Sequence, residues 1–212
     1  MSIEQTERLR NRLQASLDEL VARIGKIQIG TKEQFPFGWR KAAKGRTVWR
    51  ILEELITQNI ERYITELGIS KLTVSHSEIS VYDFHVIFED DEVPIYVNVK
   101  SALLDGKIQK DDISKGVGLQ AFYEADINRE FFIATFFIKF NEDMTIEIDK
   151  CTAFPITWIP DVYVNPSNNG NLQSSKYKNL DDAVRRTSAE FFEVFKNAMH
   201  EAARKKMIKL NS

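Results

Sequence analysis

The segment YDFHVIFEDDEVPIYVNVKS, residues 82–101, decides the fold of this chain. On both sides of the acidic run EDDE every second residue is apolar, which predicts two half-buried strands joined by a turn. Pro94 marks the start of the second strand. In an antiparallel hairpin, Asp83 lies opposite Asn98 and Lys100, which share a face because they are two residues apart. Such a hairpin gathers a carboxylate, an amide and an ammonium group.

The flanking sequence predicts helices before this hairpin and further strands after it. Leucines at helical spacing predict a first helix over residues 3–24, and a second helix is expected over 45–67 with Gly68 at its end. Further elements are expected over residues 113–126 (helix), 130–140 (a strand buried on both faces), 145–151 (strand) and 180–209 (helix). This order predicts an α/β fold in which a mixed β-sheet is flanked by α-helices, within a single domain over residues 1–212.

The amino-acid composition excludes several kinds of site and segment from this chain. The single cysteine, Cys151, excludes an internal disulfide framework and a cluster of thiolate metal ligands. No apolar run approaches the roughly 20 residues that span a bilayer. The N-terminus is charged and is unlike a signal segment, so we expect a soluble, cytoplasmic protein without a membrane partner. The net charge of −2 means that any nucleic-acid surface must concentrate its basic residues locally.

The three polar residues of the hairpin suit phosphodiester hydrolysis. That reaction needs an activated water molecule and stabilisation of the negative charge that gathers in the transition state. Asp83 is the natural anchor for Mg²⁺, and Asn98 is a weaker second ligand through its carbonyl oxygen. Lys100 is placed to orient or deprotonate the water and to offset developing charge.

The pair Asp83 … Asn98-Val99-Lys100 resembles the PD-(D/E)XK nuclease superfamily, in which an acidic residue faces an acidic-x-Lys motif on the next strand. Tyr82 replaces the proline of the motif, and Asn98 replaces its second acidic residue. Residues 38–140 resemble the catalytic core of type II restriction endonucleases, some of which carry Asn at this position. The resemblance implies a restriction-endonuclease-like fold and a Mg²⁺-dependent endodeoxyribonuclease.

Two more residues are candidates for this site. Many members of the family add a glutamate from the helix before the hairpin. Trp49, Leu52, Ile56, Ile60 and Tyr63 define the apolar stripe of that helix. Glu53 lies at the margin of the stripe, so it is a candidate metal ligand; the alternative is a surface residue that pairs with an arginine. His85 shares the face of Asp83 and is a candidate catalytic residue, with a structural histidine as its alternative.

Two segments are candidates for contact with double-stranded DNA. A basic cluster at the entrance to the second helix is predicted to bind phosphates through Arg40, Lys41, Lys44 and Arg46. Residues 152–178 are predicted to form an irregular region that reads bases, although a flexible surface loop would have the same composition. The base-reading candidates are Asn168, Asn169, Asn171, Gln173, Ser174 and Lys176.

The resemblance also implies partners and alternatives. A small enzyme that cuts both strands of a palindrome is expected to be a homodimer, through the N-terminal helix within residues 1–30 or the Phe-rich final helix. A restriction enzyme further implies a cognate DNA methyltransferase. The alternatives are a structure-specific or repair nuclease of the same superfamily and a catalytically inactive DNA-binding module, which Asn98 makes conceivable.

Overall fold

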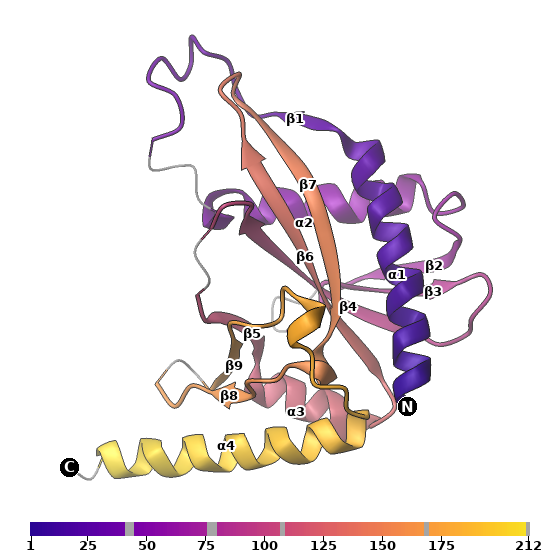
Figure 1. Ribbon diagram of the computed structural model, residues 1–212, viewed down its shortest axis with the longest axis vertical. Coiled ribbons are helices and arrows are strands. Elements are labelled where there is room, and N and C mark those ends of the chain that lie inside the picture. Colours follow the sequence, from indigo (N-terminus) through magenta and orange to yellow (C-terminus); the bar gives the residue numbers. More distant parts are fainter. Residues whose placement is uncertain (41–44, 76–79, 107–108, 168–169, 211–212) are drawn as a thin grey trace.

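A mixed β-sheet of six strands forms the centre of the part of the chain that the computed structural model describes, residues 1–40, 45–75, 80–106, 109–167 and 170–210 (Figure 1). The strands follow the order β1-β7-β6-β4-β3-β2. They are β1 (Lys26–Gln28), β2 (Ile69–Val74), β3 (Phe84–Phe88), β4 (Ile95–Leu103), β6 (Glu130–Phe140) and β7 (Thr145–Pro155). Among the described strands only β4 and β6 pair in parallel, and the crossover between them carries a helix, so the predicted mixed α/β fold is confirmed.

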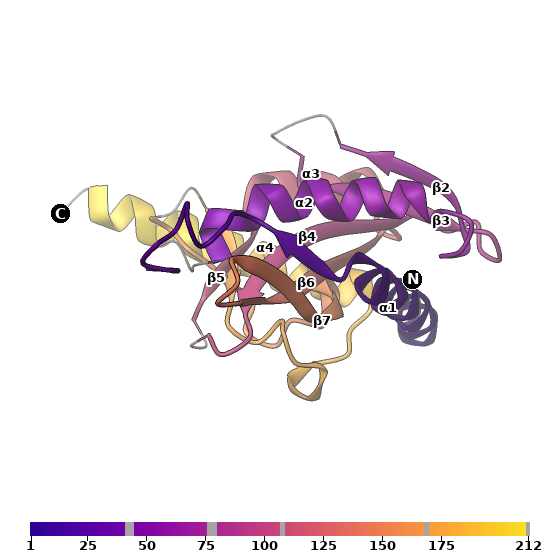
Figure 2. The same ribbon diagram turned by 90° about the horizontal axis from the view of Figure 1, so that it is seen from above.

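A second, antiparallel sheet of three strands has the order β5-β9-β8. Its strands are β5 (Asp111–Lys115), β8 (Tyr163–Val164) and β9 (Asn171–Ser174). The helices are α1 (Ile3–Ile24), α2 (Gly45–Arg62), α3 (Gly116–Ala125) and α4 (Ser188–Leu210). Seen from above, α2 runs along the large sheet beside β4 (Figure 2). None of the described helices combines the length and apolar character that crossing a membrane requires.

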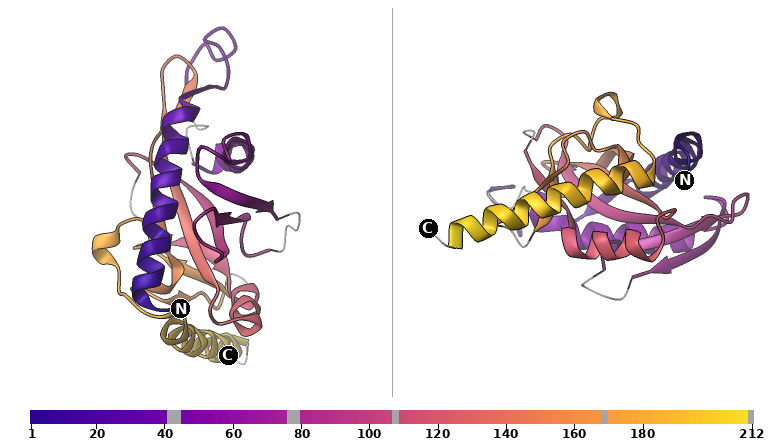
Figure 3. Two further views of the ribbon diagram at one scale, coloured as in Figure 1. Left: turned by 90° about the vertical axis from the view of Figure 1, so that its right-hand side faces the viewer. Right: turned by 90° about the horizontal axis from the view of Figure 1, so that it is seen from below.

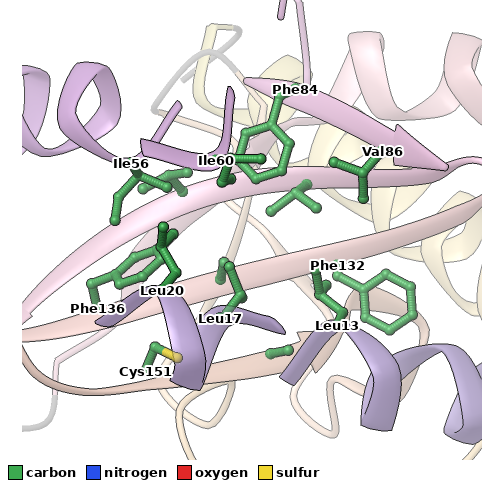
Figure 4. Packing of buried hydrophobic residues seen from close by; sticks show 14 of the residues in the cluster. Leu13, Leu17, Leu20, Ile56, Ile60, Phe84, Val86, Phe132, Phe136 and Cys151 are labelled. Carbon is green, nitrogen blue, oxygen red and sulfur yellow. The ribbon is translucent and has the colours of Figure 1, made fainter. Parts of the chain in front are cut away.

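The first hydrophobic core lies between the large sheet and helices α1 and α2. The predicted stripe of α1 is buried, with Leu13, Leu17 and Leu20 packed near Cys151 and Phe136 (Figure 4). On α2 the buried stripe consists of Val48, Leu52, Ile56 and Ile60. The burial of these apolar side chains holds both helices against the sheet.

The second core covers the other face of β6. Phe131 and Ile133 of β6 belong to this core, whereas Phe132 and Ala134 belong to the first. This strand is therefore buried on both faces, as its continuous apolar sequence predicts. Helices α3 and α4 lie side by side over the second core (Figure 3), and the rings of Tyr123 and Phe191 are 5.9 Å apart.

Several predicted boundaries were wrong. Residues 113–115 belong to β5 rather than to a helix, because they pair with β9. The region 152–178 is not irregular throughout: its first residues complete β7, and β8 and β9 follow. The final helix begins at Ser188 because Thr187 and Glu190 form a capping box there, with Glu190 N–H donating to Thr187 Oγ1 at 3.3 Å.

Glu130 is an acidic residue buried at the start of β6, with 1% of its surface exposed. Thr6 of α1 donates a hydrogen bond of 2.9 Å to its carboxyl group. Burial raises the pKa of Glu130 to about 7, and the Thr6 hydrogen bond and the N-terminal ammonium oppose this rise. The folded protein therefore holds a proton here that the unfolded chain releases at lower pH.

This proton makes stability depend on pH. Between the unfolded pKa of about 4.5 and the folded pKa of about 7, the folded state binds more protons, so the free energy of unfolding falls as pH rises. We expect Glu130→Gln, which keeps an acceptor for Thr6, to flatten this dependence and to stabilise the protein by a few kcal/mol above the folded pKa. Urea unfolding as a function of pH measures this effect. Identical pH profiles for the wild type and the variant would contradict the buried protonated state.

Candidate functional site

The β3–β4 hairpin brings Asp83 to Asn98 as the sequence predicts. Phe84 of β3 pairs with Val97 of β4, and the Asp83 N–H donates to the Val97 carbonyl at 2.8 Å. The Val99 N–H donates a hydrogen bond of 2.6 Å to Asp83 Oδ2. This bond fixes the carboxylate beside β4. No hydrogen bond to the other carboxylate oxygen, Oδ1, is formed among the described residues.

A pocket of about 530 Å³ lies where this hairpin meets α2, β5 and β9. Asn98 and Lys100 line it from β4, and Asp83 lines it from the segment before β3. Glu53 reaches it from α2, and Asn171 reaches it from β9. The helix α2 and the strands β4, β5 and β9, which are distant in sequence, thus contribute polar side chains to one cavity.

The charges in the pocket are strongly coupled. Burial and, to a smaller extent, the negative charge of Asp83 together raise the pKa of Glu53 to about 7, against the opposing effects of Arg50 and Lys100. Burial also raises the pKa of Asp83, against the Val99 hydrogen bond and the charge of Lys100. Burial lowers the pKa of Lys100, while Asp83 and Glu53 act in the opposite direction. Two desolvated carboxyl groups and one desolvated amine therefore share the pocket.

Asn98 is anchored through its amide nitrogen. Nδ2 donates to the carbonyl of Val81 at 3.2 Å and to that of Ile113 at 3.0 Å. Both partners are backbone carbonyls that can only accept, so the orientation of the amide is determined and Oδ1 points away from them. A carboxylate at this position could make neither bond. The amide therefore ties β4 to the segment before β3 and to β5.

The donor set fits a hard divalent cation. Asp83, Glu53 and Oδ1 of Asn98 offer oxygen atoms, and burial raises the pKa of both carboxyl groups, with the charge of Asp83 adding to the rise for Glu53. The described residues contain no group of three His, Cys, Asp or Glu side chains able to hold a metal. Mg²⁺ is commonly bound by one or two carboxylates together with water molecules, so this set suits it, whereas a zinc site needs more protein ligands.

Glu53 lies in the pocket as predicted, and it also pairs with Arg50 at 3.4 Å. The ion pair matches the alternative interpretation, and the role of Glu53 as a metal ligand stays a prediction. Trp49 was wrongly assigned to the buried stripe of α2. It is 39% exposed and lines the pocket, and the guanidinium of Arg50 lies 4.0 Å from the centre of its ring.

His85 was predicted as a candidate catalytic residue, but it does not line the pocket. Its ring packs near those of Tyr82 and Tyr96, with centroid distances of 6.0 and 5.2 Å. Burial lowers the pKa of His85, and Lys71 lowers it further, so the ring is neutral at physiological pH. Its Nδ1 atom is buried without a hydrogen-bond partner among the described residues, so the catalytic and the structural interpretation of His85 both stay predictions.

The basic cluster before α2 is only partly described. Arg40 is exposed and lies over the ring of Phe37 at 4.3 Å, outside the pocket. Lys41 and Lys44 lie outside the described residues, as does the side chain of Arg46. Arg50 of α2, which follows this cluster in the sequence, lines the pocket.

The predicted base-reading residues divide into three groups. Asn171 lines the pocket, and Asn168 and Asn169 lie outside the described residues. Gln173 is half-buried and donates to Asp112 at 2.7 Å, and the exposed Lys176 lies 3.9 Å from Asp182. Ser174 was wrongly predicted to contact DNA. It is fully buried, and its hydroxyl bonds to Asp161.

The apolar faces proposed for a dimer are occupied within the chain. The leucine stripe of α1 belongs to the first core. Phe191 and Phe195 of α4 are fully buried in the second core, and Phe192 is nearly so. An interface through α4 would therefore use other side chains of this helix, and the choice between α1 and α4 as the dimer surface stays a prediction.

The sequence prediction missed Ser114 and Lys115, which also line the pocket. They were assigned to a helix, and no motif singles them out. The pairing of Ser114 with Leu172 and of Lys115 with Asn171 places them there. A contact between segments so far apart in sequence leaves no local pattern.

Comparison with family models gives no match, and no curated protein matches the sequence. Among solved structures, the NlaIV restriction endonuclease is similar with a TM-score of 0.41 and 13% identity, over 74% of this chain and 74% of that chain. Because this likeness is distant, function is inferred below from the side chains of the pocket.

The anchoring of Asn98 can be tested through stability. Asn98→Asp removes both amide donors and adds a third carboxyl group to the pocket. We expect it to lower the free energy of unfolding by about 1–3 kcal/mol in metal-free buffer near neutral pH. Asn197→Asp, the same change at an exposed position of α4, is the matched control. Equal unfolding midpoints for the two variants would contradict the structural role of the amide.

Proposed function

We propose that this protein is a Mg²⁺-dependent endodeoxyribonuclease that hydrolyses phosphodiester bonds in double-stranded DNA, and that it acts as a type II restriction endonuclease. One observation carries the proposal: Glu53, Asp83, Asn98 and Lys100 converge in a single pocket. Two carboxyl groups, an amide oxygen and an amine in this arrangement match the resemblance of the hairpin to PD-(D/E)XK nucleases.

Each side chain has a distinct part in this proposal. Asp83, Glu53 and the amide oxygen of Asn98 would hold Mg²⁺, which supplies Lewis-acid activation of water and stabilisation of the leaving oxygen. The Val99 N–H holds the Asp83 carboxylate in place, so little reorganisation accompanies binding. Asn98 keeps β4 and β5 together at the site.

Lys100 acts on the phosphate and on the water. Its ammonium form donates hydrogen bonds to a non-bridging phosphate oxygen and offsets the charge that develops as water adds to phosphorus and one ester P–O bond breaks. Burial lowers its pKa, which makes the neutral amine more accessible as an acceptor for the proton that the water loses. The leaving oxygen takes a proton from solvent.

A homodimer and a cognate methyltransferase belong to the type II proposal. Among the described residues this constellation of side chains occurs once, so cutting both strands of a palindrome calls for two copies of the chain. A cell that carries such an enzyme must protect its own sites, and methylation of the bases does so. Sedimentation of the protein with duplex DNA tests the stoichiometry.

The assigned chemistry is tested by removing one group at a time. We expect Asp83→Asn and Lys100→Met each to slow the nicking of supercoiled DNA with Mg²⁺ by at least about 100-fold, because each removes a group that acts in the transition state. Lys139→Met, at an exposed position of β6 outside the pocket, should cleave at the wild-type rate. Circular dichroism checks that the variants are folded.

The outcomes separate the proposal from its competitors. A folded Asp83→Asn or Lys100→Met variant with near wild-type rate would refute the assigned site. DNA binding by the wild-type protein without cleavage in Mg²⁺ or Mn²⁺ would favour an inactive binding module. Cleavage that follows DNA branches or ends, rather than sequence, would favour a structure-specific nuclease.

Metal binding should depend on pH with a defined sign. In the metal-free protein the pKa of Glu53 is about 7 and that of Asp83 is raised, so a cation competes with protons for both. We expect the affinity for Mg²⁺ to rise between about pH 6 and 8 as the proton of Glu53 is lost. Isothermal titration calorimetry measures the affinity. Glu53→Gln should weaken binding and reduce its pH dependence, and an unchanged affinity would remove Glu53 from the ligand set.

A further inference from the structure

One part of the pocket is not used by the proposed chemistry. It lies where β5 runs into α3, and Ser114 and Lys115 line it there. Lys115 is the N-cap residue of α3, and its side chain makes no capping hydrogen bond to the first turn of this helix. Asn171, which pairs with Lys115 across the small sheet, lines the same pocket.

The first turn of α3 offers backbone donors. The Gly116 N–H donates to the Gly170 carbonyl at 3.2 Å, an approach that a side chain at Gly116 would block. The N–H groups of Val117 and Gly118 follow at positions that have no partner within a helix. Together with the helix dipole they make this end of α3 electropositive. The first turn contains no acidic residue that would neutralise it.

Ser114 provides an independent indication that a ligand binds here. The residue is 7% exposed, and its hydroxyl oxygen is buried without a hydrogen-bond partner among the described residues. An unsatisfied buried hydroxyl costs on the order of 1–3 kcal/mol. Because Ser114 lines the pocket, an entering oxyanion can accept this hydrogen bond. The nearby acidic residue Asp112 accepts a hydrogen bond from Gln173.

We propose that the Ser114 hydroxyl, the Lys115 ammonium group and the N–H groups of Val117 and Gly118 form a subsite for an internal phosphodiester of DNA, next to the phosphodiester that is cleaved. The proposal rests on the proposed nuclease function and deepens it. Ser114 and Lys115 line the same cavity as Asp83 and Lys100, so a strand that places one phosphate at the reactive groups brings a neighbouring phosphate toward α3. Helix N-termini bind phosphates readily because donors and dipole act together.

A substitution of Ser114 should change the affinity for DNA without lowering the stability of the protein. Ser114→Ala removes a hydroxyl that makes no bond within the described protein, so the thermal midpoint should stay the same or rise. The affinity for a short duplex of mixed sequence, measured by fluorescence anisotropy with Ca²⁺ in place of Mg²⁺, should fall about three- to tenfold. An affinity equal to that of the wild type would overturn the role of Ser114.

Substitution of Lys115 tests the charge of the subsite. Lys115→Gln should weaken binding and lower the slope of log affinity against log salt by about 0.9, the effect of one lost phosphate contact. Lys139→Gln, at an exposed position of β6 outside the pocket, should leave the slope unchanged. Equal slopes for the two variants would overturn the subsite.

A duplex without terminal phosphates shows whether the subsite binds an internal phosphate or a DNA end. The outcomes for the wild-type protein and the two variants then separate a failure of the subsite from a failure of the proposed function. Removal of the terminal phosphates from the duplex should leave the affinity unchanged. If the affinity falls on their removal, and this loss disappears in Ser114→Ala, the subsite binds DNA ends and not an internal phosphodiester. If wild-type affinity persists in both subsite variants, the subsite is wrong while the proposed function stands. Failure of the wild-type protein to bind duplex DNA would refute the proposed function and the subsite together.

Discussion

The pairing of β3 with β4 is the constraint on which the site depends. It places the Val99 N–H 2.6 Å from Asp83 Oδ2, so a carboxylate is held against a buried strand instead of turning to solvent. The same strand presents Asn98, whose amide ties β4 to the backbone of Val81 and Ile113. A shift of the register by one residue would turn Asn98 and Lys100 to the opposite face of the sheet and abolish the pocket.

The pocket gathers groups that destabilise one another. Asp83 and Glu53 are desolvated close together, which raises the pKa of both, and Lys100 offsets only part of their charge. Buried like charges of this kind are costly and are typical of sites that act on a ligand. A neutral amide suits position 98 of this pocket. An acidic residue in place of Asn98 would add negative charge and leave two backbone carbonyls without a donor. The departure from the acidic-x-Lys pattern thus has a structural reason.

The parts of the fold and site that local sequence determines could be predicted. Alternation around Asp83 and Asn98 predicts the hairpin, and helical spacing places Glu53 near the apolar stripe of α2. The pairing of β5 with β9 could not be foreseen, since it joins residues about sixty positions apart. For the same reason Ser114 and Lys115 were missed, and Ser174 was mistaken for a surface residue although tertiary packing buries it.

The most direct test of the account is incubation of the purified protein with long duplex DNA and Mg²⁺, followed by gel electrophoresis. The account predicts a fixed set of discrete fragments, which appear with Mg²⁺ and are absent when the metal is chelated. Intact DNA in the presence of both Mg²⁺ and Mn²⁺ would contradict it, and the grouping of Asp83, Glu53, Asn98 and Lys100 would then need an explanation other than phosphodiester hydrolysis.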